Sequence, residues 1–333
     1  MEINDGTLAQ LGEEWVIARA AKIFGTGGQW VGIGDDTAVT KIEKASAVTT
    51  VDLLVEGIHF RRETSSAYDV GWKAIAVNLS DIAAMGASPL WAVLGLALPK
   101  DTPGSWVEEL FRGMKEISEK FGLSIVGGDT VGSPGKIFIS LTVIGEAEKP
   151  VLRTGGLPGW QILVTGYAGA SAAGLWLLEN SEKIENSENL ENIEDFARVI
   201  EKHRRPVPQI EAGKVIGRGE ACLLDNSDGL FRSCQLLAEG SGLTARIDSK
   251  EIPIDEPTRR VAELAGVDPL DWALWGGEDY HLVAAVPNSR LAEISSSLEG
   301  LGVLCRVVGV LQAGDPKVLI DEKRLEAHPF RHF

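Results

Sequence analysis

Apolar and polar residues alternate with two different periods along the first half of the chain. Apolar residues at intervals of three and four predict amphipathic helices, whereas alternating runs rich in β-branched residues predict strands. The second of the predicted helices is mostly apolar, ends at Gly86 and is followed by Pro89. On this basis we predict helices over 11–24, 68–85 and 105–121, and strands over 45–55, 90–98, 123–126 and 137–146.

The second half also alternates strands with helices. We predict strands over 162–165, 221–224, 243–247 and after Tyr280, and helices over 171–179, 230–239, 258–264 and after Pro206. Residues 149–160 are rich in Pro, Gly and Arg, which favours a boundary between domains 1–148 and 149–333. Residues 181–195 are rich in Ser, Glu and Asn and are expected to form a surface insertion. No segment repeats at a solenoid period, so the order of elements predicts a two-domain α/β or α+β protein.

Composition limits the class of protein. The 333 residues fit two domains, and 44% hydrophobic residues can fill their cores. No apolar run reaches the ~20 residues of a membrane span, and Glu2 and Asp5 interrupt the start where a secretory signal would be apolar. The three cysteines lack metal-ligand spacing, so we expect reduced thiols and a cytoplasmic protein. A formal charge of −16 argues against a nucleic-acid partner.

Charge becomes informative where acids lie beside glycine. Five short segments share this design, in the patterns GxGDD, GGDT and DNSDG among others, and most are expected where a strand or helix meets a turn. Magnesium prefers hard oxygen ligands and bridges a few carboxylates to substrate phosphates, while neighbouring glycines let backbone N–H groups approach those phosphates. The segments therefore predict a nucleotide site with several Mg²⁺ ions; they contain Asp35 and Asp36, Asp52, Asp81, Asp129, and Asp225 with Asp228.

Each acidic segment has a simpler interpretation when taken alone. An Asp beside Gly is commonly a turn or a helix N-cap, and Asp228 could cap the helix expected at Leu230. Asp81 differs because it lies inside an otherwise apolar helix, where a lone carboxylate is costly unless it is paired or coordinated. Other nucleotide and hydrolase motifs are absent: there is no GxxxxGK[ST], no complete GxGxxG before a helix and no GxSxG.

Seven sequence blocks, which run in order along most of the chain, resemble the thiamine-monophosphate kinase family. They are GIGDDTAV at 32–39, DLLVEGIHF at 52–60, KAIAVNLSDIAAMGASP at 73–89, GGDT at 127–130, RTG at 153–155, DNSDGL at 225–230 and GGEDY at 276–280. The blocks VEGIHF and VNLSDIAAMGA are specific to this branch of the wider superfamily related to aminoimidazole ribonucleotide synthetase.

The resemblance implies a reaction and a fold. The reaction is phosphorylation of thiamine monophosphate by ATP to thiamine diphosphate, the last step of thiamine diphosphate biosynthesis. The fold is of the two-domain aminoimidazole ribonucleotide synthetase type. In it, the N-terminal domain binds ATP and Mg²⁺ and dimerises through its β-sheet, and a larger C-terminal α/β domain completes the active site. We therefore expect a homodimer.

The resemblance also implies the roles of individual residues. The implied metal ligands are Asp36, Thr50, Val51, Asp52, Asp81, Asp129, Asp225 and Asp228. The implied ATP contacts are Gly128, Asp129, Arg153 and Ser227, and the implied thiamine phosphate contacts are His59, Glu278 and Phe330. Because the attacking group is already a phosphate oxygen, positioning and charge neutralisation suffice and no general base is expected. His59 is expected to donate a hydrogen bond to the substrate, although it could be an ordinary histidine at a strand end.

Three positions depart from the family pattern. Val51 replaces a residue with a side-chain oxygen, so a metal contact there would have to come from its carbonyl group. His281 replaces the usual acid after GGEDY, and we expect it on a strand surface. An aromatic residue should stack on thiamine near the end of the chain, where Ala327 aligns and Phe330 lies close by.

Three other classes of protein fit the sequence less well than a thiamine-phosphate kinase. Selenophosphate synthetase would need a reactive cysteine near its start, whereas the first cysteine here is Cys222. A hydrogenase-maturation relative would end in a cysteine-bearing tail, whereas this sequence ends in His332 and Phe333. A regulator that binds metal and nucleotide without catalysis would be expected to lack some of the acids, yet all five segments keep theirs.

Overall fold

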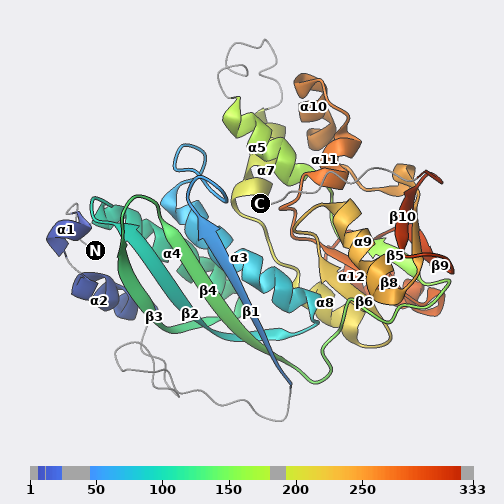
Figure 1. The fold of residues 1–333 in the computed structure, drawn as a ribbon, viewed down its shortest axis with the longest axis horizontal. Helices are drawn as coiled ribbons and strands as arrows, with labels where there is room; N and C mark the ends of the chain where they lie inside the picture. The colour runs from blue at the N-terminus through green and yellow to red at the C-terminus, as the bar shows by residue number, and fades with distance from the viewer. Residues whose placement is uncertain (1–6, 12, 25–45, 181–192, 324–333) are drawn as a thin grey trace. The chain divides into compact units, whose positions relative to one another are not determined.

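The computed structural model describes residues 7–11, 13–24, 46–180 and 193–323, and Figure 1 shows their fold. Asp36 and Phe330 of the predicted site lie outside these residues. The chain divides into two compact units, one of 1–82 with 88–148 and one of 83–87 with 149–333. Within the described residues, no helix is long and apolar enough to cross a membrane.

The first unit is built on a four-stranded sheet in the order β1-β4-β2-β3. Strand β4 pairs antiparallel with β1 and β2, whereas β2 and β3 are parallel and are connected by a helix. The strands are β1 (Ser46–Val55), β2 (Ser88–Pro99), β3 (Ser124–Ser133) and β4 (Phe138–Ala147). The helices are α1 (Leu8–Leu11), α2 (Glu13–Phe24), α3 (Ala67–Ala84) and α4 (Gly104–Phe121).

The two faces of this sheet differ in exposure because side chains alternate along each strand. Paired residues Leu54, Ile139 and Leu96 are buried in one row, and α3 and α4 lie behind the sheet in Figure 1. The other face keeps large apolar residues in contact with solvent. Its most exposed members are Val51 (53%), Leu53 (55%), Val131 (52%) and Phe138 (40%).

Helices α3 and α4 cross at two glycines that no other residue could replace without movement. A Cβ atom on Gly71 would lie 2.0 Å from the carbonyl oxygen of Leu110, and one on Gly113 would lie 2.0 Å from that of Tyr68. The reciprocal contacts bring the two backbones together and fix how α3 lies against α4.

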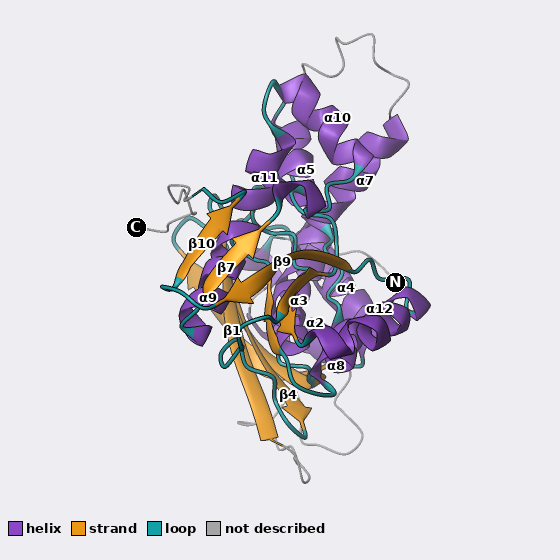
Figure 2. Cartoon of the chain, turned by 90° about the vertical axis from the view of Figure 1, so that its right-hand side faces the viewer, coloured by secondary structure: helices purple, strands orange, loops and turns teal. Residues whose placement is uncertain are grey.

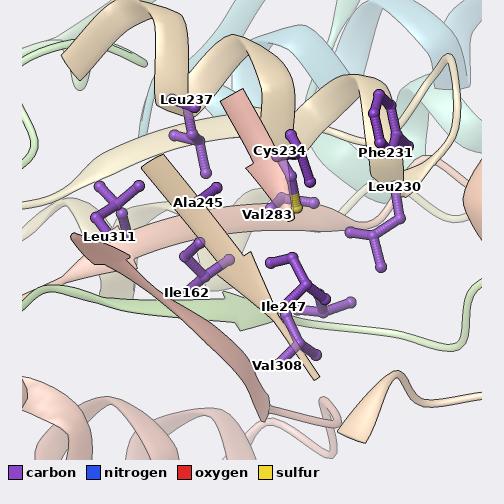
Figure 3. Close-up of a cluster of buried hydrophobic side chains, with 14 of the residues drawn as sticks. Ile162, Leu230, Phe231, Cys234, Leu237, Ala245, Ile247, Val283, Val308 and Leu311 are labelled. Atoms are coloured by element: carbon purple, nitrogen blue, oxygen red, sulfur yellow. The ribbon is translucent and has the colours of Figure 1, made fainter. Parts of the chain in front are cut away.

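The second unit is built on a six-stranded sheet in the order β10-β7-β9-β5-β8-β6. Only β10 and β7 are parallel; the other neighbours are antiparallel. Helix α9 covers one face, where residues such as Ile162, Val283 and Leu237 form the apolar core drawn in Figure 3. The strands are β5 (Gln161–Val164), β6 (Cys222–Asp225), β7 (Thr244–Ile247), β8 (Leu282–Val286), β9 (Arg306–Gln312) and β10 (Lys317–Ile320).

Three helices of this unit form a smaller cluster of their own. Helices α5, α7 and α10 lie side by side in Figures 1 and 2, and they bury Leu177, Val199 and Val261 between them. The α-helices of the unit are α5 (Ala170–Glu179), α7 (Ile193–Arg204), α8 (Ile210–Gly217), α9 (Leu230–Ser241), α10 (Glu256–Ala265), α11 (Pro269–Trp275) and α12 (Leu291–Gly300). Two 3-10 turns are η2 (Ser249–Glu251) and η3 (Asn288–Arg290).

Most predicted elements are confirmed to within a few residues, but one predicted strand is longer and several elements were not predicted. Strand β3 continues through Gly127, Gly128 and Asp129 to Ser133, so this acid lies inside a strand and not in a loop after it. The elements that were not predicted are α1, α7, α11, α12, β9 and β10. The start of α7 lies in the segment that was expected to be an insertion, and α11 begins at a proline capped by Asp268.

Candidate active site

Strand β1 and helix α3 bring three of the predicted metal ligands together. Thr50 and Asp52 lie two residues apart on β1, on the same face as the buried Leu54, and this face meets α3. Asp81 lies in the last turn of α3, and its Oδ2 accepts a short hydrogen bond from the Thr50 hydroxyl group. Thr50, Asp52 and Asp81 are hereafter called the β1–α3 acidic group.

Burial and proximity of two like charges perturb this group. Burial, and then the negative charge of Asp81, raise the pKa of Asp52 from 3.8 to about 7. Burial also raises the pKa of Asp81, while the hydrogen bond from Thr50 partly opposes the increase. Two carboxylates in this position repel each other when both are ionised, and a bound divalent cation would relieve the repulsion. The donor set of two carboxylates and a hydroxyl group suits magnesium.

The register of the sheet separates Asp129 from these acids. Asp52, Leu141, Leu94 and Gly128 pair in one row across all four strands, and Asp129 belongs to the next row with Leu53. Adjacent rows point to opposite faces, so Asp129 lies on the exposed face of the sheet. Gly128 has no room for a side chain, because a Cβ atom there would lie 1.9 Å from the Leu94 carbonyl oxygen.

Val51 also belongs to the exposed face, since it lies between Thr50 and Asp52 on β1. Its side chain therefore points away from the β1–α3 acidic group. No cluster of three or more His, Cys, Asp or Glu residues suited to a metal ion occurs in the described part of the chain. Asp52 and Asp81 are both partly buried, and together they could supply two oxygen ligands to a divalent cation.

His59 lies in the turn that follows β1, where Gly57 takes a left-handed conformation (φ 88°). Its Nδ1 accepts a hydrogen bond from the backbone N–H of Val55 at 3.1 Å, so a neutral ring carries its proton on Nε2. Glu56 fixes the same turn: it accepts the N–H of Ile137 at 3.0 Å and pairs with Arg62 at 2.8 Å. The donor of the neutral ring is therefore Nε2.

In the second unit, the DNSDG and GGEDY segments form one interlocked structure. The N–H of Glu278 donates to the carbonyl oxygen of Ser227 at 2.6 Å, and that of Tyr280 donates to Asn226 at 3.0 Å. Glu278 (φ 56°) and Tyr280 (φ 51°) both take the left-handed conformation that costs energy for residues with side chains. Such strain persists only where surrounding contacts enforce it, and it often marks functional loops.

The predicted ligands of the DNSDG segment lie at the start of α9. Asp225 is the last residue of β6, and Asp228 is exposed. The N-cap of α9 is Gly229, with no side-chain capping bond, so the interpretation of Asp228 as a helix cap is wrong. Arg153 is exposed, and its neighbour Leu152 bridges to Cys222, at the opposite end of β6 from Asp225.

Behind Glu278 lies a buried polar arrangement that sequence analysis missed. The carboxylate of Asp279 accepts the N–H groups of Gly169 at 2.8 Å and Ser171 at 3.0 Å, at the start of α5. Burial is the main cause that raises the pKa of Asp279 to about 7. His203 of α7 lies with Nδ1 3.0 Å from the Ser171 hydroxyl oxygen and 3.5 Å from Oε2 of Glu278. The only sequence signal was Asp279 beside Glu278 in the GGEDY block.

The prediction that His281 lies on a strand surface is wrong. Its side chain is only 3% exposed, because it lies between the ends of β5 and β6, and Gly166 leaves space for its ring. Burial, and then the positive charge of Lys202, lower the pKa of His281 to about 3, so the ring is neutral at physiological pH.

Comparison with known proteins identifies first the class and then the family. Residues 34–147 match the model of the AIR synthase related protein N-terminal domain, and residues 158–322 match that of the corresponding C-terminal domain. The chain is therefore an AIR synthase-related protein with both domains.

Relatives that match over nearly the whole chain identify the family within this class. The chain is 35% identical to the thiamine-monophosphate kinase of Aquifex aeolicus, over 90% of this chain and 92% of the relative. It is also 35% identical to that of Bacillus subtilis, over 91% and 93%. The chain belongs to the thiamine-monophosphate kinase family, as the sequence blocks predicted.

Solved structures agree with this assignment. The Stenotrophomonas maltophilia thiamine-monophosphate kinase matches with a TM-score of 0.83 at 29% identity, over 94% of this chain and 98% of that chain. The AaThiL structure complexed with AMPPCP and TMP matches with a TM-score of 0.78 at 34% identity, over 98% and 99%. A hydrogenase maturation protein HypE in complex with ATP shares the fold (TM-score 0.76) at only 18% identity, over 97% and 98%. These matches confirm the predicted fold class.

Proposed function

We propose that this protein phosphorylates thiamine monophosphate with ATP, giving thiamine diphosphate and ADP, and that Mg²⁺ ions held by its aspartates assist the transfer. Relatives of nearly the same length support the reaction, and a structure of similar fold was solved with AMPPCP and TMP. The observation on this chain that carries the proposal is the β1–α3 acidic group: two partly buried carboxylates with raised pKa values beside a hydroxyl group.

Asp52, Asp81 and Thr50 are the first residues we assign to the metal. Magnesium bound there would neutralise charge on the phosphates of both substrates. Protons leave Asp52 and Asp81 when the cation binds, because carboxylates coordinate as anions. We assign the remaining predicted ligands by the family resemblance alone, and they are Asp36, the Val51 carbonyl group, Asp129, Asp225 and Asp228.

Substrate contacts follow the same assignment. His59 accepts the Val55 N–H on Nδ1, and we assign the N–H donor at its Nε2 to an anionic acceptor on thiamine monophosphate. Glu278 carries negative charge suited to the cationic thiazolium compound, and Phe330 is assigned to stacking. Gly128, Asp129, Arg153 and Ser227 are assigned to ATP; the planar guanidinium of Arg153 suits phosphate.

Catalysis by positioning requires no strong general base. The nucleophile is a phosphate oxygen that is ionised at neutral pH, so the chain has to align it, shield charge and exclude water. Oriented donors and fixed carboxylates can do this without forming a covalent bond to the substrate.

The quaternary structure and location are further parts of the proposal. The exposed face of the first sheet carries Val51, Leu53, Val131 and Phe138, an apolar surface suited to a second copy of the chain. We assign domain 1–148 to ATP, Mg²⁺ and dimerisation, and domain 149–333 to the rest of the active site. A cytoplasmic location fits the use of ATP and the free thiols of the three cysteines.

A direct assay tests the reaction. Purified protein is incubated with ATP and Mg²⁺ together with thiamine monophosphate, with thiamine, with other phosphate monoesters or with no acceptor. ADP and thiamine diphosphate should form in equal amounts only with thiamine monophosphate, and chelation of Mg²⁺ should stop their formation. ATP and Mg²⁺ binding without turnover of thiamine monophosphate would instead favour a regulator or another acceptor.

A further inference from the structure

A buried polar junction joins three elements of the second unit directly behind Glu278. It consists of Ser171 at the start of α5, His203 in the last turn of α7, and Asp279 in the GGEDY segment. None of them belongs to the β1–α3 acidic group or to the substrate contacts assigned above.

Asp279 fastens the GGEDY segment to the start of α5. Its two carboxylate oxygens accept one backbone N–H each, from Gly169 and Ser171, which are among the otherwise unsatisfied donors at a helix start. This attachment helps to hold the neighbouring Glu278 in its left-handed backbone conformation (φ 56°). This attachment does not fix the torsion angles of the Glu278 side chain, so another contact is needed to orient its carboxylate.

His203 contacts that side chain from behind. His203 is 4% exposed, whereas the Glu278 side chain is 29% exposed. The Glu278 side chain therefore contacts His203 on one side and solvent on another. Nδ1 of His203 is 3.5 Å from Oε2 of Glu278 and 3.0 Å from Oγ of Ser171. A carboxylate accepts hydrogen bonds, so an attractive contact requires a proton on Nδ1, and the Ser171 hydroxyl oxygen then accepts from the same N–H group.

We infer that His203 is a positioning residue: its Nδ1–H holds the Glu278 carboxylate in the orientation that contacts thiamine monophosphate, and Ser171 keeps the imidazole ring in place. The inference rests on the proposed function, because it gives Glu278 a substrate. A contact of 3.5 Å is long for a hydrogen bond, and contacts of this kind tighten when a ligand orders the acceptor. His203 itself does not touch the substrate in this arrangement.

Two substitutions of nearly equal size separate the Nδ1 contact from simple packing. In His203→Asn the amide nitrogen takes the place of Nδ1 and keeps a donor for Glu278. In His203→Gln the amide nitrogen takes the place of Nε2, so that donor is lost. Val199→Ala is the packing control, because Val199 is buried on the same face of α7 one turn earlier and its side chain has no hydrogen-bonding group.

The readouts are the dissociation constant for thiamine monophosphate by calorimetry, KM and kcat with both substrates, and thermal stability. We expect His203→Gln to weaken binding of thiamine monophosphate and raise its KM about tenfold, the loss typical of a hydrogen bond to a charged group. Its KM for ATP should stay within about twofold. His203→Asn should bind within about threefold of the wild type, and Val199→Ala should lower only the thermal stability. When Glu278→Gln is already present, His203→Gln should have no further effect on binding.

Several results would overturn the inference. Equal affinities of the Asn and Gln variants would show that Nδ1 has no special role, and so would a full additional loss in the Glu278→Gln background. The proposed function is tested separately, on the wild-type protein. If that protein neither binds nor phosphorylates thiamine monophosphate, both the proposed function and this inference are overturned. Wild-type protein that binds it while all His203 variants bind equally well overturns only the role of His203.

Discussion

Replacing Asp81 with Asn should make the metal-free protein more stable and the enzyme inactive. The change removes one of two like charges in the β1–α3 acidic group and keeps the shape of the side chain. It also keeps an oxygen that can accept the hydrogen bond from the Thr50 hydroxyl group. A residue that served only to stabilise the fold would lose stability on substitution, whereas a charge retained for metal binding should show the opposite sign.

The magnitude follows from the pKa of Asp52. A rise from 3.8 to about 7 is roughly three pKa units, which corresponds to about 4 kcal/mol. Because the folded-state pKa lies above the unfolded one, the folded protein binds more protons between these values. The metal-free protein therefore loses stability as pH rises from about 4 to 7, and the full loss is present at pH 8. Burial of Asp52 is the larger cause of its raised pKa, and Asp81→Asn leaves this cause unchanged. We therefore expect the variant to recover only about 1 to 2 kcal/mol of the lost folding stability at pH 8.

Chemical denaturation at pH 5 and pH 8, with and without Mg²⁺, measures this effect. Wild-type protein should gain stability from Mg²⁺ at pH 8, by about 1.4 kcal/mol at ten times its dissociation constant, and the variant should gain much less. Mg²⁺-dependent formation of thiamine diphosphate should disappear in the variant. Asp101→Asn, which changes an exposed aspartate of the same unit, should match the wild type in both assays. The reasoning is refuted if Asp81→Asn keeps wild-type turnover, or if it is less stable than the wild type at pH 8.

Three more perturbations test separate parts of the structure. Thr50→Val should weaken Mg²⁺ binding about tenfold at pH 7 in calorimetry, because the variant loses the hydrogen bond that lowers the pKa of Asp81. Thr50→Ser keeps the hydroxyl group and should bind Mg²⁺ like the wild type, and equal Mg²⁺ affinities of the Val and Ser variants would contradict this role. Gly113→Ala should destabilise the protein by at least about 3 kcal/mol despite the better helix propensity of Ala, because the added Cβ would lie 2.0 Å from the Tyr68 carbonyl oxygen. Gly132→Ala is the control: a Cβ there has no heavy atom within 4 Å, so stability should change by less than about 1 kcal/mol. Leu53→Glu should convert the proposed dimer into a monomer in light scattering, whereas Leu301→Glu in the second unit should not; an unchanged mass for Leu53→Glu would place the interface elsewhere.

Local sequence was sufficient for most of the secondary structure. Helix α3 has a long apolar pattern that ends at Gly86, and β1 has a run of β-branched residues, so spacing alone predicted both elements. Helix α7 was missed for another reason. Its apolar residues Phe196, Val199 and Ile200 have helical spacing, but its start lies in a segment rich in Ser, Glu and Asn that was interpreted as an insertion.

The same division holds for the candidate site. An aspartate inside the apolar pattern of α3 indicated on its own that Asp81 has a function, because such a carboxylate is costly without a partner. The nature of its neighbours could not follow from the sequence, since Thr50 and Asp81 are 31 positions apart and meet only when β1 lies against α3. Register, too, is a tertiary property: it puts Gly128 in the row of Asp52 and Asp129 on the opposite face.

The sequence by itself determined the family, the reaction that we propose and most of the acids, because these depend on short blocks of residues with fixed spacing. The tertiary structure decided which of those acids share a charged environment and which histidines are buried. It moved His281 from an expected surface to the interior, and it joined Ser171, His203 and Asp279 behind Glu278. These facts depend on contacts between distant segments, and pKa values and side-chain orientation depend on such contacts more than on neighbours in the chain.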